Sequence, residues 1–128
     1  MVWSESDYFT WTFGCTGAPA NTQFLTLGFA ASNANEVQWP VPMACQIRQV
    51  AALHRIASGG GETITYTVRD DGADTLGVAT IIDPAVDNTY DGAINVAAGS
   101  LISVQCAAGG GVGACVDVTV TVTFRILV

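Results

Sequence analysis

The chain has 128 residues; 50% of them are hydrophobic, 12% are charged, and the formal net charge is −7, with no lysine. This length suits one domain with a core of its own, and the acidic balance argues against nucleic-acid or anionic-membrane binding, which needs clustered cations. Since an average soluble domain has about 25% charged residues, we expect part of this surface to be covered by a partner.

The N-terminal third is predicted to hold two strands. Residues 1–7 read as a polar arm, and Tyr8 to Thr16 alternates cleanly between two faces, as a half-buried strand does. A second, short strand is expected at Gln23–Leu27. Residues 28–40 are rich in small residues and Asn, which predicts a loop ending at Trp39-Pro40.

Val41 to Ala57 is the segment for which strand and helix both stay open. Its composition suits a helix, and its apolar residues recur every three positions, at Ile47, Val50, Leu53 and Ile56. We predict a long strand with a bulge near Val50–Ala52, because Pro42 precedes it and the rest of the chain is strongly β. The helix remains the alternative.

Ser58 to Ile82 is predicted to form a β-hairpin. Ile64, Tyr66 and Val68 share one face, and the intervening Thr and Arg residues share the other. Asp71-Gly72 supplies the positive φ angles of a tight reversal. Val78–Ile82 follows as the partner strand.

The C-terminal part is predicted to contain three further strands. Asp87, Asn88 and Asp91-Gly92 indicate a turn-rich loop, followed by strands at Ala93–Val96, Leu101–Ala107 and Cys115–Leu127. The total is about eight strands, which is the number in an antiparallel jelly-roll β-sandwich. The whole of residues 1–128 is treated as one such domain. The predicted core contains Tyr66, Val68, Val104, Val118, Val120, Val122 and Phe124.

The four cysteines are interpreted from strand parity. Cys15, Cys45 and Cys106 share faces with apolar residues and should be small buried hydrophobes. Cys115 has the parity of Asp117, opposite the apolar face. A Cys106–Cys115 disulfide needs a bulge to bring the two together, so free thiols are the favoured reading and the disulfide is the alternative.

No residue pattern points to catalysis, a metal or a cofactor. His54 is the only histidine and is interpreted as an ordinary strand residue, because one histidine cannot build a multi-histidine metal centre. Asp70, Asp71 and Asp74 coincide with a hairpin turn, where Asp is favoured for backbone reasons. The glycine-rich segments 58–61 and 109–113 lack the helix and Lys of a phosphate loop. We therefore expect no enzyme activity.

Trp3, Trp39 and Tyr90 are the candidate partner-interface residues. All three lie in predicted arm or loop sequence rather than at alternating strand positions. Aromatic residues there serve as protein–protein anchors or as platforms for sugars. The alternative is that they fold back over the ends of the sandwich.

The sequence shows no export or membrane signal. The start, MVWSESDYFTW, has no basic region followed by an apolar core. No apolar run approaches the roughly 20 residues of a membrane span. We expect assembly in a cytoplasm.

Four segments from Val41 onward resemble a jelly-roll domain found in structural proteins of tailed bacteriophages. They are VPMACQIRQVAAL, ETITYTVRDDGADT, INVAAGSLISVQCAAGGG and VDVTVTVTF. Ser100 replaces the Asp that usually follows the glycine in that pattern, and residues 1–40 lie outside the resemblance. The resemblance implies a jelly roll in a virion, and it carries over no catalytic residues.

Such domains occur in capsid cement, or decoration, proteins and in tail-fibre or receptor-binding heads that bind host glycans. The cement role fits better, because the chain has no coiled-coil or shaft segment. We expect a virion protein on the capsid surface, assembled in the host cytoplasm, with the major capsid protein as its partner. A homo-oligomer is expected, with a trimer favoured and a dimer possible, and residues 1–7 and 28–40 are the candidates for reaching the shell.

Overall fold

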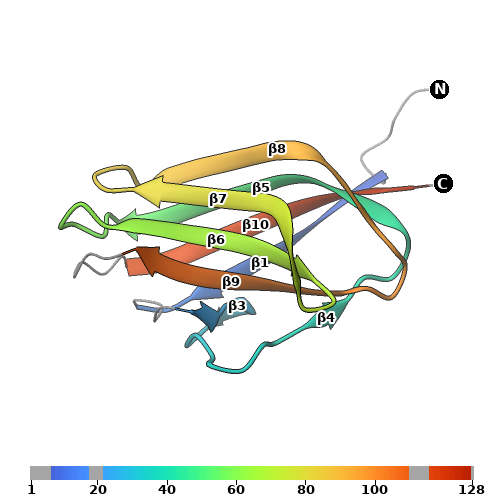
Figure 1. The fold of residues 1–128 in the computed structure, drawn as a ribbon, viewed down its shortest axis with the longest axis horizontal. Coiled ribbons are helices and arrows are strands. Elements are labelled where there is room, and N and C mark those ends of the chain that lie inside the picture. The colour runs from blue at the N-terminus through green and yellow to red at the C-terminus, as the bar shows by residue number, and fades with distance from the viewer. Residues whose placement is uncertain (1–6, 18–21, 110–115, 128) are drawn as a thin grey trace.

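The computed structural model describes residues 7–17, 22–109 and 116–127, which fold into two packed β-sheets (Figure 1). No helix is found in these ranges. Ten strands are present, and two of them, β2 and β4, have only two residues. The strands are β1 (Tyr8–Cys15), β2 (Gln23–Phe24), β3 (Thr26–Ala30), β4 (Trp39–Pro40), β5 (Cys45–Ile56), β6 (Thr63–Asp70), β7 (Ala73–Ile82), β8 (Asp87–Val96), β9 (Leu101–Gly109) and β10 (Val116–Ile126).

The sheets have the strand orders β3-β1-β10-β5-β8 and β2-β9-β6-β7, and β4 pairs with β9. We call the first sheet A and the second sheet B. All pairings are antiparallel except that of β1 with β3, which is parallel. The predicted all-β sandwich is therefore correct, with one parallel pair that the sequence did not indicate.

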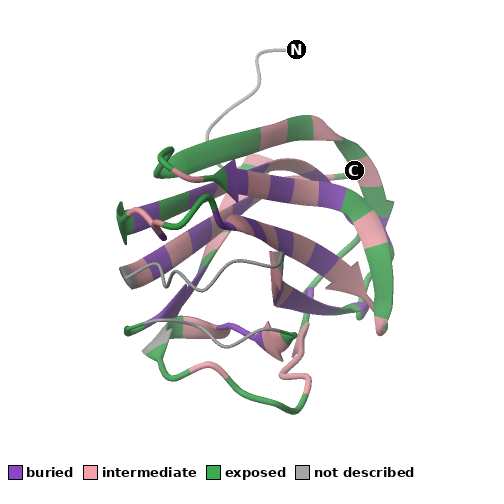
Figure 2. Ribbon diagram, turned by 60° about the vertical axis from the view of Figure 1, so that its left-hand side comes forward, coloured by how far each residue is buried: buried purple, intermediate pink, exposed green. Residues whose placement is uncertain are grey.

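The hairpin of β6 and β7 has the predicted design. Thr63 pairs with Ile82 and Asp70 with Ala73, so β7 begins earlier than the predicted Val78. Asp71 and Gly72 have φ angles of 50° and 80°, as a tight reversal requires. Along β6 and β7, buried and partly exposed residues alternate, as Figure 2 shows.

Residues 45–56 form a strand, so the helical alternative for this segment is wrong. The bulge predicted near Val50–Ala52 lies instead at Arg48. In the ladder with β10, Ile47 and Gln49 pair with adjacent residues, and Arg48 pairs with none. The ladder with β8 shifts at the same point. Because of this bulge, the adjacent side chains of Arg48 and Gln49 both lie on the outer face of β5.

The turn-rich loop predicted at Asp87–Gly92 is wrong, because these residues belong to β8. β8 is the edge strand of sheet A, with one side open to solvent. Its polar residues therefore meet water on that side, and some are used in the ladder. The Gln46 amide donates to Asn95 Oδ1 at 2.9 Å, and the Gln49 amide donates to Asp91 Oδ1 at 3.0 Å. Turn-forming residue types are tolerated at such an edge.

The predicted short strand at Gln23–Leu27 is divided at Leu25, where the chain passes from sheet B to sheet A. Leu25 is fully buried, and its N–H donates to the Val104 carbonyl at 2.9 Å. β2 before it pairs with β9, and β3 after it pairs with β1. The loop predicted at 28–40 is accordingly shorter, because its first residues complete β3 and its last two form β4.

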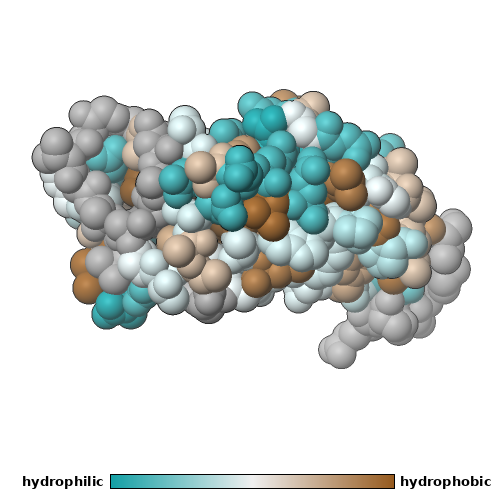
Figure 3. All heavy atoms as spheres, turned by 90° about the horizontal axis from the view of Figure 1, so that it is seen from below, coloured by the Kyte–Doolittle hydropathy of each residue, from teal (hydrophilic) through white to brown (hydrophobic). Residues whose placement is uncertain are grey.

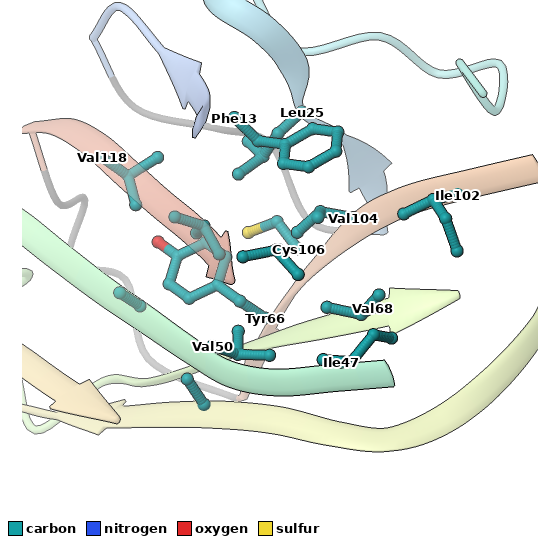
Figure 4. Packing of buried hydrophobic residues seen from close by; sticks show 14 of the residues in the cluster. Phe13, Leu25, Ile47, Val50, Tyr66, Val68, Ile102, Val104, Cys106 and Val118 are labelled. Atoms are coloured by element: carbon teal, nitrogen blue, oxygen red, sulfur yellow. The ribbon is translucent and has the colours of Figure 1, made fainter. Parts of the chain in front are cut away.

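The core lies between the two sheets and contains the predicted residues. All seven predicted core residues are at 0% exposure. Figure 4 shows Phe13, Leu25, Tyr66 and Cys106 converging between the layers. Cys15, Cys45 and Cys106 are buried, as predicted, and Cys15 and Cys45 are free thiols, while Cys115 lies outside the described residues. Burial and nearby Asp70 raise the pKa of Cys45 to about 11, so this thiol is unreactive at neutral pH.

Candidate functional site

The three predicted interface aromatics have different surroundings. Trp39 pairs with Ile102 in β4, and its ring contacts Phe13 edge-on, with 5.6 Å between centroids. Tyr90 lies in β8, not in a loop, and its half-buried ring packs against the core. Trp3 lies outside the described residues. Both described rings thus cover the sandwich of their own chain while leaving part of their surface exposed.

The acidic turn is organised around Arg69, whose guanidinium lies on the outer face of sheet B. Arg69 forms ion pairs with Glu36 at 3.2 Å and with Asp74 at 3.1 Å, and it donates to the Gly72 carbonyl. The Ser103 hydroxyl donates to the same Glu36 carboxylate at 2.6 Å. This network fastens the 31–38 loop onto sheet B.

Asp70 and Asp71 complete the turn. Burial raises the pKa of Asp70, a hydrogen bond from Ser100 opposes that rise, and the charge of Asp71 adds to it. Asp71 Oδ1 accepts the Leu101 N–H at 2.8 Å. These contacts bind the β6–β7 turn to the start of β9, which agrees with the structural interpretation of the acidic residues.

His54 is a buried residue that joins the two sheets. Its Nε2 lies 2.6 Å from the Tyr66 hydroxyl, and His54 and Tyr66 are at 1% and 0% exposure. Burial lowers the pKa of His54, so the neutral imidazole is favoured. Nδ1 makes no hydrogen bond. The sequence prediction treated His54 as an ordinary strand residue. It missed that His54 is one of the few polar residues buried inside the sandwich.

Glu62 is a second buried polar residue, placed where the glycine-rich turn enters β6. It is 1% exposed, and neither carboxylate oxygen makes a hydrogen bond. The turn before it is held by Asp83, whose carboxylate accepts the N–H groups of Gly59 and Gly61 at 2.9 and 3.1 Å. The glycines therefore serve a capped turn, and the described part of the chain contains no group of three or more metal-ligating side chains.

Several large apolar side chains are exposed to solvent. Leu76 on β7 is 80% exposed and Ile82 at the end of the same strand is 57% exposed. Leu53 and Ile56 on β5 are about half exposed, at 48% and 49%. Seen from below, apolar surface is interrupted by hydrophilic residues (Figure 3). Such side chains are suited to contact with another macromolecule.

A surface depression of about 670 Å³ lies on the outer face of sheet A, at the β5 bulge. Gln49 stands between Thr123 of β10 and Asp91 of β8 in the two ladders. Because the bulge leaves Arg48 outside both ladders, Arg48 and the adjacent Gln49 both line the depression. The lining residues are Tyr8, Arg48, Gln49, Asp91, Gly92, Ala93 and Thr123.

Arg48 differs from the other arginines in its charge partners. Arg55 pairs with Asp117 at 2.8 Å, Arg69 is held as described, and Arg125 has an interaction of its own. Within the residues that the structure describes, Arg48 has no acidic partner. The sequence prediction missed this site because its residues come from four strands far apart in the chain. No signal in the sequence singled out Arg48, because all four arginines of the chain lie within strands.

Comparison of the sequence with protein-family models and with curated proteins gives no match. Across the described ranges, no helix has the length and apolar character needed to cross a membrane. The described residues therefore form a β-sandwich domain with exposed apolar side chains and a surface depression on the outer face of sheet A.

Proposed function

We propose that the sandwich is a jelly roll. The order β1-β10-β5-β8 faces the order β2-β9-β6-β7, so strands distant in sequence are neighbours. Along these eight strands the chain changes sheet at every step except between β6 and β7, which pair as a hairpin. This arrangement is that of two Greek keys wrapped into two four-stranded sheets, with β3 and β4 as additions at the edges. The strand order supports the resemblance of the segments after Val41 to phage jelly-roll domains.

We propose that this protein is a bacteriophage capsid cement, or decoration, protein that binds the outer surface of the major capsid lattice and stabilises the head. The observation that carries the proposal is the set of exposed apolar side chains in a chain with 12% charged residues. Leu76 has almost no contact with its own domain, so its exposure is best accounted for by a partner surface. The proposed role is structural and includes no catalytic step.

A homotrimer is the proposed assembly, with a dimer as the alternative. Sheet A ends in β8 and sheet B ends in β7, and the β7 edge carries Leu76 and Ile82. Packing around a symmetry axis covers such edges and apolar side chains together. Capsid lattices offer threefold and twofold axes, which suit both assemblies.

The test is rebinding of the purified protein to capsids from which it has been stripped. We expect rebinding and a raised tolerance of the capsids to heat and low salt. Leu76→Ser should weaken rebinding or self-association without loss of folding, because the side chain is 80% exposed. Val68→Ser, at a buried position, is the contrasting variant and should impair folding itself. Absence of rebinding by folded protein would refute the cement role.

Deletion of residues 1–7 tests the proposed arm. We expect the truncated protein to keep its fold and to bind capsids more weakly. Light scattering checks the assembly. A monomer at high concentration, together with capsid binding unchanged by the deletion, would rule out the proposed oligomer and arm.

The second candidate function is that of a tail-fibre or receptor-binding head that binds host glycans. The polar depression at Arg48 favours it, because cement binding gives no reason for an unpaired arginine in a concave site. A glycan array beside the capsid assay distinguishes the two roles.

A further inference from the structure

The depression on sheet A has the size and composition of a small-molecule site. Its volume of about 670 Å³ is within the range of roughly 300–1,000 Å³ typical of ligand pockets. The bulge at Arg48 places the two adjacent side chains of Arg48 and Gln49 in its lining. Bulges are often found beside functional sites for this reason.

The charge of Arg48 specifies one part of a ligand. The chain has 11 acidic residues, and the arginines at 55 and 69 already have acidic partners. A half-buried guanidinium without such a partner provides several N–H donors in a planar fork that matches a carboxylate. A bound carboxylate would supply the missing charge partner.

Asp91 specifies a second part. Its Oδ1 accepts the Gln49 amide at 3.0 Å, and Asp91 is exposed and lines the depression. An ionised carboxylate only accepts hydrogen bonds, so a ligand must bring hydroxyl or N–H donors to it. An acidic amino-acid side chain would bring a carboxylate for Arg48 and no hydroxyl group for Asp91. A sugar acid brings both a carboxylate and several hydroxyl groups.

The remaining lining agrees with a sugar ring. Tyr8 is 40% exposed and offers an aromatic face with a phenolic hydroxyl, and Thr123 offers a further hydroxyl. We propose that this depression binds an acidic saccharide, with the sugar carboxylate on Arg48 and ring hydroxyls donating to Asp91. The proposal is independent of the capsid role, because it concerns the outer face of sheet A alone.

The test is a titration of the ¹⁵N-labelled full chain with glucuronate and with glucose, which differ at C6. Galacturonate and N-acetylneuraminate extend the acidic series. We expect saturable shifts at Arg48, Gln49 and Asp91 with at least one acidic sugar, and weaker binding of the matched neutral sugar. Affinity for the acidic sugar should fall as ionic strength rises.

Arg48→Gln and Asp91→Asn separate the two halves of the site. Arg48→Gln should lower the affinity for the acidic sugar about tenfold or more, since a charge-assisted contact is lost, and should remove the preference over the neutral sugar. Asp91→Asn should weaken both sugars. Arg55→Gln is the matched control: it changes the net charge equally on the same strand outside the depression, and affinity should be unchanged.

The proposal is overturned by four results. The first is the absence of saturable shifts with all three acidic sugars, and the second is equal affinity for glucuronate and glucose. The third is tighter binding of a Glu-containing tripeptide than of any sugar. The fourth is an equal loss of affinity for the acidic sugar in Arg55→Gln and Arg48→Gln. The amide spectrum of each variant shows whether it is folded. If Arg48→Gln does not fold, the salt dependence and the glucuronate-to-glucose ratio of the unmodified chain decide the outcome. Capsid rebinding is measured separately, so either proposal can fail alone.

Discussion

Arg69 and Arg48 occupy similar positions on opposite sides of the molecule, and their environments differ. Each lies on the outer face of a strand within its sheet, β6 in sheet B and β5 in sheet A. Arg69 is covered by the 31–38 loop, with Glu36, Asp74 and the Phe24 ring around it. Arg48 lines an open depression without an acidic partner among the described residues. The same residue type therefore serves structure on one face and is available for binding on the other.

The largest expected effect is on stability when the two arginines are replaced in turn. Arg69→Gln should lower the free energy of unfolding by about 2–3 kcal/mol, because it leaves the partly buried Glu36 carboxylate without its cation. Arg48→Gln should change it by less than about 0.5 kcal/mol, as expected for a surface residue without partners. Urea unfolding measures both. Equal losses for the two variants would contradict the distinction between the faces.

The Arg69 network also explains what the sequence could and could not predict. Alternation in β6, β9 and β10 predicted Tyr66, Val104, Val120 and the other four residues of the predicted core, because burial on one face imposes a period of two. Nothing in the sequence connects Glu36 with Arg69, which are 33 positions apart. The sequence therefore did not predict that a loop covers this part of sheet B, and it placed Arg69 only on the face opposite Tyr66 and Val68.

The same limit applies to sheet A. The strand predicted at Ala93–Val96 lies within β8, but residues 87–92 were missed, because Asp and Asn are turn-forming types whose preference is overridden at an exposed edge strand. The bulge was predicted two to four residues too late, because apolar spacing cannot locate an unpaired residue. The depression depends on both features. The strand parity of Cys15, Cys45 and Cys106 was enough to predict their burial, because a buried cysteine follows the alternating pattern of its apolar neighbours.

A smaller effect on the free energy of unfolding is expected from Glu36→Gln, which tests the contact between the 31–38 loop and Arg69. The amide oxygen can still accept the Ser103 hydroxyl, but the charge that faces Arg69 is lost. We expect a loss of about 1 kcal/mol. Asp74→Asn is the matched control, because the Asp74 side chain is 65% exposed and its pair with Arg69 should contribute less than about 0.5 kcal/mol. Thermal unfolding in parallel measures both, and a larger loss in Asp74→Asn would show that the turn, not the loop, holds Arg69.

The smallest expected effect comes from His54, which joins the two sheets from inside. Burial lowers the pKa of His54 in the folded protein below its ordinary value of 6.5. As pH falls through 6.5, the unfolded chain therefore takes up the proton first, and stability falls until the pH reaches the lower folded pKa. Between pH 7.5 and 6.0 the loss is at most about 0.8 kcal/mol, even if the folded imidazole stays neutral throughout.

Urea unfolding at a series of pH values measures this slope. His54→Gln is expected to remove the His54 contribution to the slope between pH 7.5 and 6.0, whatever the variant does to the absolute stability. Asp70 contributes with the opposite sign, because its raised pKa lets the folded state take up a proton first, and this contribution is retained in the variant. The difference between the two slopes therefore isolates His54. If stability rises as pH falls over this range in the unmodified chain and does so less in the variant, the imidazole is protonated in the folded state and its bond with Tyr66 does not favour the neutral form.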